Sequence, residues 1–154
     1  GLDLDLRYDM ETDVGIFNFG YVLNYVTNYE EQRLNAAGGL RLHREAGDFE
    51  QPEFRWTLST GWSHKSFDAN VALNYIDDFK GKADAGFGDK TVDSMMTVDA
   101  LISYRGWENT RITLGVTNLF NEEPPFSHHD FMGYVTGIHS GQGRFSYLKV
   151  DYSF

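Results

Sequence analysis

The side chains best suited to chemistry lie in one polar stretch near the C-terminus. His128, His129 and Asp130 are consecutive there, and His139 follows in the same stretch. Imidazole rings beside a carboxylate can bind a transition metal or a metal chelate. Consecutive side chains rarely point at one ion, however, and a solvated loop that touches sugars or lipid headgroups explains the cluster more simply. We therefore predict ligand contacts here, but no resident metal and no cofactor.

Aromatic residues surround this cluster. Phe126 precedes it, and Phe131 and Tyr134 follow it. Their rings can stack on a sugar or on an aromatic ligand, and they are equally able to pack loops against each other. The candidate ligand contacts are therefore His128, His129, Asp130, Phe126, Phe131 and Tyr134.

The sequence offers no arrangement that favours catalysis. No Ser sits in a nucleophile elbow, and no glycine-rich loop follows a strand and opens a helix. The 154 residues include no Cys, which excludes thiol chemistry and disulfides. The net charge of -10 argues against nucleic acid, because phosphate binding needs a surplus of Lys and Arg. We predict that the chain is not an enzyme and has no nucleic-acid partner.

The elements that must position these residues are seven segments in which apolar and polar side chains alternate. This spacing of two is the period of a β-strand, and no window of similar length follows the helical period. Most segments reach the roughly 9–11 residues that a tilted membrane strand needs, whereas soluble strands have about 5–6. The predicted strands are 2–10, 17–25, 54–62, 67–75, 96–104, 111–117 and 143–154.

The connections between these segments alternate in length. The short ones are 11–15, 63–66 and 106–109, and the long polar ones are about 31–52, 77–94 and 119–142. Tight turns at one end and long loops at the other are typical of outer-membrane barrels. Aromatic residues such as Tyr25, Trp62 and Trp107 lie near strand ends, as in the girdles of such barrels.

The polar faces of the predicted strands suit water better than a protein core. Asp3, Asp5, Arg7 and Asp9 share one face of the first strand, and unpaired charge is costly to bury. The apolar faces would then contact lipid. Two alternatives stay open: a soluble β-sandwich that binds carbohydrate and needs no detergent, and a small outer-membrane barrel hydrolase, which needs a Ser, a His and an acid together.

A motif in the last third of the chain resembles a known family. Residues 111–126, RITLGVTNLFNEEPPF, form a strand that leads into Asn-Leu-Phe-Asn, acidic residues and Pro. This stretch, the preceding strand 98–105 and the alternating run 143–154 are similar to the C-terminal end of TonB-dependent outer-membrane receptors. The resemblance is specific over 97–154, and over 1–66 it rests on the alternation alone.

The resemblance implies an all-β fold: an antiparallel up-and-down meander of about seven long strands, the C-terminal part of a transmembrane β-barrel of about 22 strands. Residues 1–154 would be one segment of that barrel, and the N-terminal plug domain and the earlier strands would lie elsewhere. Val150, Tyr152 and Phe154 would form the C-terminal signal for barrel assembly.

The resemblance also implies a location and a role. The location is the bacterial outer membrane, and the role is active uptake of a scarce nutrient, such as a ferric siderophore, cobalamin or an oligosaccharide. The implied partners are outer-membrane lipid and lipopolysaccharide, the barrel-assembly machinery, TonB through the missing N-terminal part, and the small-molecule nutrient.

Two local expectations accompany this interpretation. Asn118 and Asn121 can end a strand, since Asn bonds its own backbone and adopts turn conformations. A charge at Leu114 or Val116 should block membrane assembly, whereas the same charge at Thr113 should be tolerated.

Overall fold

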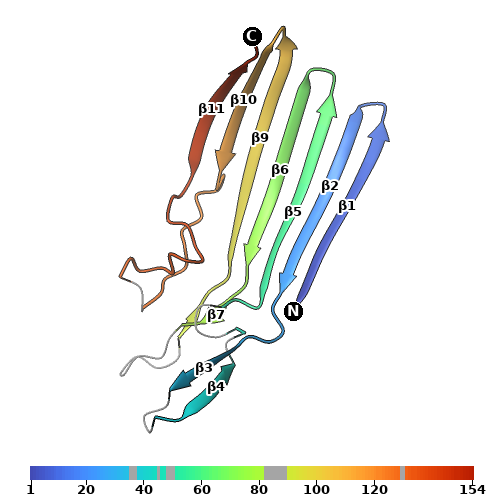
Figure 1. The fold of residues 1–154 in the computed structure, drawn as a ribbon. Coiled ribbons are helices and arrows are strands. Elements are labelled where there is room, and N and C mark those ends of the chain that lie inside the picture. Colours follow the sequence, from blue (N-terminus) through green and yellow to red (C-terminus); the bar gives the residue numbers. More distant parts are fainter. Residues whose placement is uncertain (35–37, 45, 48–50, 82–89, 129–130) are drawn as a thin grey trace.

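The structure is a computed structural model that describes the chain except for residues 35–37, 45, 48–50, 82–89 and 129–130. Seven long strands form one antiparallel sheet in the order β1-β2-β5-β6-β9-β10-β11 (Figure 1). Their bounds are β1 Leu2–Thr12, β2 Gly15–Tyr25, β5 Phe54–His64, β6 Phe67–Ile76, β9 Met95–Trp107, β10 Thr110–Thr117 and β11 Phe145–Tyr152. No helix in the described part of the chain is long and apolar enough to cross a membrane.

The pairing register brings the apolar side chains of all seven strands onto one face. Because directly paired residues of antiparallel strands point to the same side, one continuous row crosses the sheet. That row is Met10, Phe17, Trp62, Ala69, Ile102, Leu114 and Leu148. The alternation in the sequence therefore predicted the orientation of each strand.

This apolar face is uncovered. Leu6, Leu114 and Leu148 are exposed by 54%, 56% and 68%. In the described part of the chain, no second sheet packs on the apolar face of this sheet. The second layer that a soluble β-sandwich requires is therefore absent from the described residues. Phe19 and Leu73, on the same face, are only half-buried, by their neighbours in the sheet.

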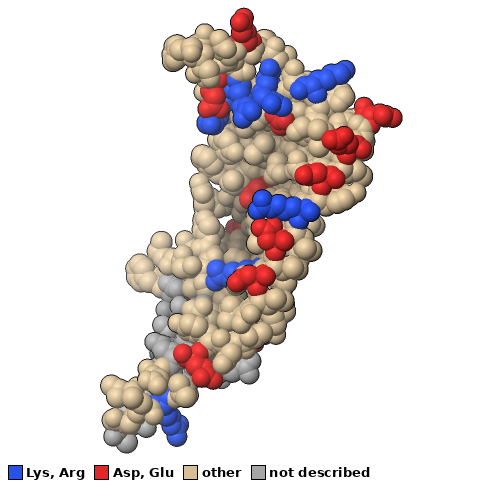
Figure 2. Space-filling model, turned by 45° about the vertical axis from the view of Figure 1, so that its right-hand side comes forward, with Lys and Arg blue, Asp and Glu red and all other residues tan. Residues whose placement is uncertain are grey.

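The opposite face carries polar side chains that bond across strands. Thr57 donates to Asn74 at 3.1 Å, and Asn74 donates to Asp99 at 2.9 Å, which links β5, β6 and β9. Between β9 and β10, Ser103 and Thr113 share a hydrogen bond of 2.7 Å, and both are buried. Figure 2 shows charged side chains, most of them acidic, along the edge where β1 lies.

The two ends of the sheet differ as predicted. At one end, residues 13–14, 65–66 and 108–109 join neighbouring strands, and the C-terminus lies at this turn end (Figure 1). At the other end, the loop end, the long connections contain two hairpins of their own, which the sequence did not predict. These are β3 (Glu30–Leu34) with β4 (Leu40–Arg44), and β7 (Phe79–Lys80) with β8 (Thr91–Val92).

A β-bulge interrupts the pairing of β9 and β10 near the turn end. Tyr104 pairs with Ile112, but the next pair is Trp107 with Thr110, so β9 has one residue more than β10 between them. Gly106 lies in this bulge, where a side chain would collide with the ring of Tyr104. Trp107 therefore shares the face of Tyr104, and their rings meet edge to face at 5.7 Å.

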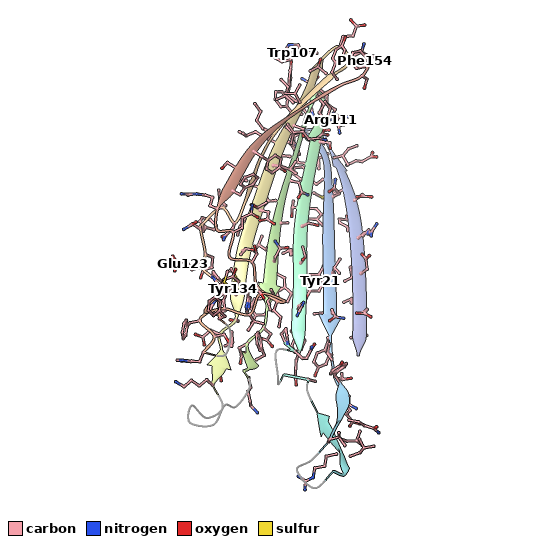
Figure 3. All side chains as sticks on the ribbon, turned by 60° about the vertical axis from the view of Figure 1, so that its left-hand side comes forward. Tyr21, Trp107, Arg111, Glu123, Tyr134 and Phe154 are labelled. Carbon is pink, nitrogen blue, oxygen red and sulfur yellow. The ribbon has the colours of Figure 1, made fainter. Side chains whose placement is uncertain are left out.

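The residues predicted as an assembly signal lie toward the turn end, where Tyr152 pairs with Thr110 and Val150 with Ile112, and Figure 3 shows Phe154 near Trp107. Val150, Tyr152 and Phe154 are all exposed, and the rings of Tyr152 and Phe154 are 5.2 Å apart. Strand β11 ends at Tyr152, so Phe154 lies just beyond the strand rather than within it. Their role in assembly stays a prediction.

Candidate ligand-binding site at the loop end

The long connections meet in a small apolar core. Phe79, Val92 and Val135 are exposed by only 1–3%, and Ile138 packs against them. Phe79 and Val92 come from the β7–β8 hairpin, whereas Val135 and Ile138 come from the connection between β10 and β11. A backbone hydrogen bond of 2.9 Å from Lys80 to Gly47 adds the β2–β5 connection. The loops are therefore held to each other.

His139 lies at the edge of this core. Its ring stacks on Phe79 with centroids 5.8 Å apart, and the residue is 96% buried, since only 4% of its surface is exposed. Within the described part of the chain, neither ring nitrogen has a hydrogen-bond partner. Burial lowers the pKa of the imidazole from its ordinary value of 6.5, and the charge of Arg55 lowers it further. At neutral pH the ring is uncharged.

A pocket of about 330 Å³ opens beside His139 on the polar face of the sheet. One wall of the pocket comes from β6 and β9, near the ends of these strands that join the long connections. The opposite wall comes from the connection that precedes β11. Polar groups and apolar groups both line it, including Asn74, Asp99, Asn118, Ile138, His139 and Gln142. Concave sites of this size with a few placed polar groups suit small ligands.

The Asn-Leu-Phe-Asn motif fixes one rim of this pocket. Asn118 and Asn121 adopt left-handed φ angles of 49° and 58°, as expected for residues that end a strand. The Asn118 side chain donates to the Glu122 carbonyl and accepts from the Glu122 N–H, both at 2.8 Å. The Asn118 backbone N–H donates to Asp99 at 2.8 Å, and the Arg144 N–H donates to Asn121 at 3.0 Å. The motif thus ties the end of β10 to β9 and to the start of β11.

None of the described residues among the predicted ligand contacts lines this pocket. His128 is exposed, with its ring against Phe126 at 4.7 Å and Lys90 Nζ 3.3 Å from its Nε2 atom. Phe131 is fully exposed, and the Tyr134 ring lies over Gly141 (Figure 3 labels Tyr134). His129 and Asp130 lie outside the described residues, so the six-residue cluster stays a prediction.

Two residues of the pocket could not be assigned from the sequence. His139 stood beside the predicted cluster but gave no sign of burial, and Asp99 looked like any polar residue of an alternating strand. The available signal was their position, since Asp99 lies one strand away from the motif that begins at Asn118. Among the residues that the structure describes, no three His, Asp or Glu side chains are grouped closely enough to hold a metal ion.

Comparison with solved structures identifies the fold. The chain is similar to the siderophore receptor PirA of Acinetobacter baumannii, with a TM-score of 0.55 and 13% identity, over 97% of this chain and 31% of that one. It is similar to a mutant form of the ferric enterobactin receptor PfeA of Pseudomonas aeruginosa, with a TM-score of 0.53 and 13% identity, over 97% and 30% of the two chains. No protein-family model matches the sequence, and neither does any curated protein.

The fold is that of a β-barrel segment of a siderophore receptor. The predictions of an all-β antiparallel fold and of a resemblance to TonB-dependent receptors are confirmed at the level of the fold. The chain spans about 31% of the length of PirA, so it corresponds to a part of that receptor.

Proposed function

We propose that this chain is a wall segment of a TonB-dependent receptor in a bacterial outer membrane, and that the whole receptor takes up a scarce small-molecule nutrient. The observation that carries the proposal is the continuous apolar face across all seven strands. A solvent-exposed apolar surface of that extent is rare on a soluble monomer, because most such patches cover only a few hundred Å². Contact with hydrocarbon removes the cost of exposing it.

The dimensions of the sheet agree with this proposal. Strands β1, β2, β5, β6 and β9 have 10 to 13 residues, and a tilted strand needs about 9–11 to cross the hydrocarbon. The polar face would then line a wet interior, where Asp99 and its amide partners need no apolar cover. The loop end would face outward and the turn end toward the periplasm.

The partners follow from the proposed family. Transport would need the TonB-coupled part of the receptor, and insertion would need the barrel-assembly machinery and outer-membrane lipid. The nutrient could be a ferric siderophore, cobalamin or an oligosaccharide. The solved structures of similar fold are receptors, which supports a binding and uptake role rather than catalysis. In addition, the His139 ring nitrogens contact no described acid, which a catalytic triad would require.

A pair of lysine substitutions on neighbouring residues of β6 tests the proposal. Val71 is 41% exposed on the apolar face, and Lys at the bilayer midplane costs about 2–4 kcal/mol. Val71→Lys in the full-length receptor should therefore lower the amount recovered folded in the outer-membrane fraction, measured by heat-modifiable migration on gels.

The matched control is Asn70→Lys, which places the same charge on the polar face. Asn70 is half-buried, and its side chain makes no hydrogen bond with another described residue. Thr113 is a poorer control than the alternation suggested, because it is buried against Ser103. Equal losses for Val71→Lys and Asn70→Lys would contradict a lipid-facing wall.

A further inference from the structure

The pocket beside His139 is built from fixed parts. Asp99 is held by two donors, the Asn118 backbone N–H at 2.8 Å and the Asn74 side chain at 2.9 Å. Ile138 packs against the buried core of the loops, and the backbone N–H of His139 donates to the Val135 carbonyl at 2.8 Å. The polar groups that line the pocket are therefore positioned before any ligand arrives, which lowers the entropic cost of binding.

His139 leaves hydrogen-bonding capacity unused. A buried imidazole normally pairs both ring nitrogens, because an unpaired buried polar group costs about 1–3 kcal/mol. In the described structure neither nitrogen is paired, although the residue lines a pocket large enough for a ligand. A neutral imidazole offers one donor and one acceptor. A hydroxyl group can satisfy either one.

The charge of the pocket selects against anions. Among the described residues that line it there is no Lys or Arg, and the one charged residue among them is Asp99. A carboxylate or phosphate on a ligand would meet the negative charge of Asp99, and Arg55, whose charge acts on His139, lies outside this lining. The remaining polar lining consists of hydroxyl and amide groups, such as Thr97, Ser140 and Gln142.

The pocket also has apolar walls. Ile76, Met95 and Ile138 line it beside the polar groups. A ligand that fits must therefore combine hydroxyl groups at its edge with a ring or chain of C–H groups. The volume of about 330 Å³ sets the size of the occupant.

We propose that this pocket binds a neutral, hydroxyl-bearing ring, of the kind that a sugar provides, with His139 as a hydrogen-bonding partner. The inference rests on the proposed function in that it names the ligand class of the receptor. The pocket opens on the polar face, away from the apolar face that lipid would contact, so the ligand is a free sugar rather than the sugar of a lipid.

Ligand-observed NMR titrations of the full-length receptor in detergent test this proposal. The probes are glucose and maltose, with glucuronate as an anionic comparison of similar size to glucose and lipopolysaccharide as a competitor. His139→Phe keeps a ring against Phe79 and removes both nitrogens, so it should weaken sugar binding about fivefold. Ser140→Trp, at an exposed position on the pocket rim, should abolish binding by filling the space, and it carries the test if His139→Phe fails to fold.

His64→Phe is the matched control, because His64 lies at the turn end of β5, far from the pocket along the strand. It should bind sugars as the unmodified receptor does. The proposal is overturned if the unmodified receptor binds neither sugar, or if the Ser140→Trp variant binds sugar as tightly as the unmodified receptor. It is also overturned if glucuronate binds more tightly than glucose. Competition by lipopolysaccharide would overturn the assignment to a free sugar. Failure of these titrations would leave the membrane assembly of Val71→Lys and Asn70→Lys unaffected, so the two proposals are tested separately.

Discussion

The turn end and the loop end of the sheet keep their shape by different contacts. At the turn end, two residues join each pair of strands, and Lys65 and Asn109 adopt left-handed φ angles of 53° and 56°. At the loop end, side chains from distant parts of the chain form a core. All the buried hydrophobic residues that the structure describes lie there: Ala46, Phe79, Val92, Met95 and Val135.

The contrast indicates where each end obtains its stability. The turns have two residues each, so a substitution within one of them is expected to change mainly the local backbone energy. The loop end depends on contacts of Phe79 and Val92 with residues 135–139, so the loss of one side chain should release several loops at once. Substitutions at the two ends can test this difference.

The largest effect is expected for Phe79→Ala. A Phe-to-Ala change in a buried site costs about 3–5 kcal/mol, from lost burial and the cavity left behind. We expect faster amide hydrogen exchange in residues 131–139, while the strands of the sheet stay protected. Phe131→Ala is the control, because Phe131 is fully exposed. Amide hydrogen exchange in residues 131–139 of this variant should match that of the unmodified protein. Loss of protection throughout the sheet would show that the two ends are not independent.

A smaller effect is expected on acidification, since the contact of His139 with Phe79 is kept. The docked ring has a lowered pKa, so as the pH falls below 6.5 the opened loop takes up a proton before the docked loop does. The docked state therefore loses stability as the pH falls from 6.5 toward the lowered value, and it is unaffected above 6.5.

Hydrogen exchange in residues 131–139 at about pH 7.5 and 5.5, corrected for the intrinsic rate, measures this loss. A His139→Gln variant should show the same protection at both pH values. A loop that opens equally with acid in that variant would assign the effect to another group.

The smallest effect is expected at the turn end, for Lys65→Gly. Gly removes the strain of a left-handed φ but adds freedom to the unfolded chain, and these terms oppose each other. The free energy of unfolding in urea titrations should therefore change by less than about 1 kcal/mol. A larger loss would mean that the Lys65 side chain makes a contact on which the turn end depends.

The sequence was sufficient for features that depend on near neighbours. Alternation with a period of two is local, and it predicted the apolar face from Met10 to Leu148 once the strands paired in order. The left-handed Asn118 and Asn121 followed from the turn chemistry of Asn. The lengths of the connections predicted which strand ends lie together.

The loop-end core and the pocket could not be predicted in this way. Phe79 and His139 are 60 positions apart in the chain, and no local pattern reports that they stack. Phe79 was one of several loop aromatics in the sequence, and the choice between packing and ligand contact depended on how the connections meet. The β3–β4 hairpin was missed because its polar residues were read as an irregular loop.

The bulge at Gly106 also has a consequence for the depth at which the sheet sits. Simple alternation from Tyr104 would turn Trp107 toward the polar face, and the extra residue returns the indole to the side of Tyr104 and Tyr152. Indole and phenol rings are most stable at the boundary between headgroups and hydrocarbon. In the membrane wall that we propose, one inserted residue would thus place an aromatic anchor at the end of the strand.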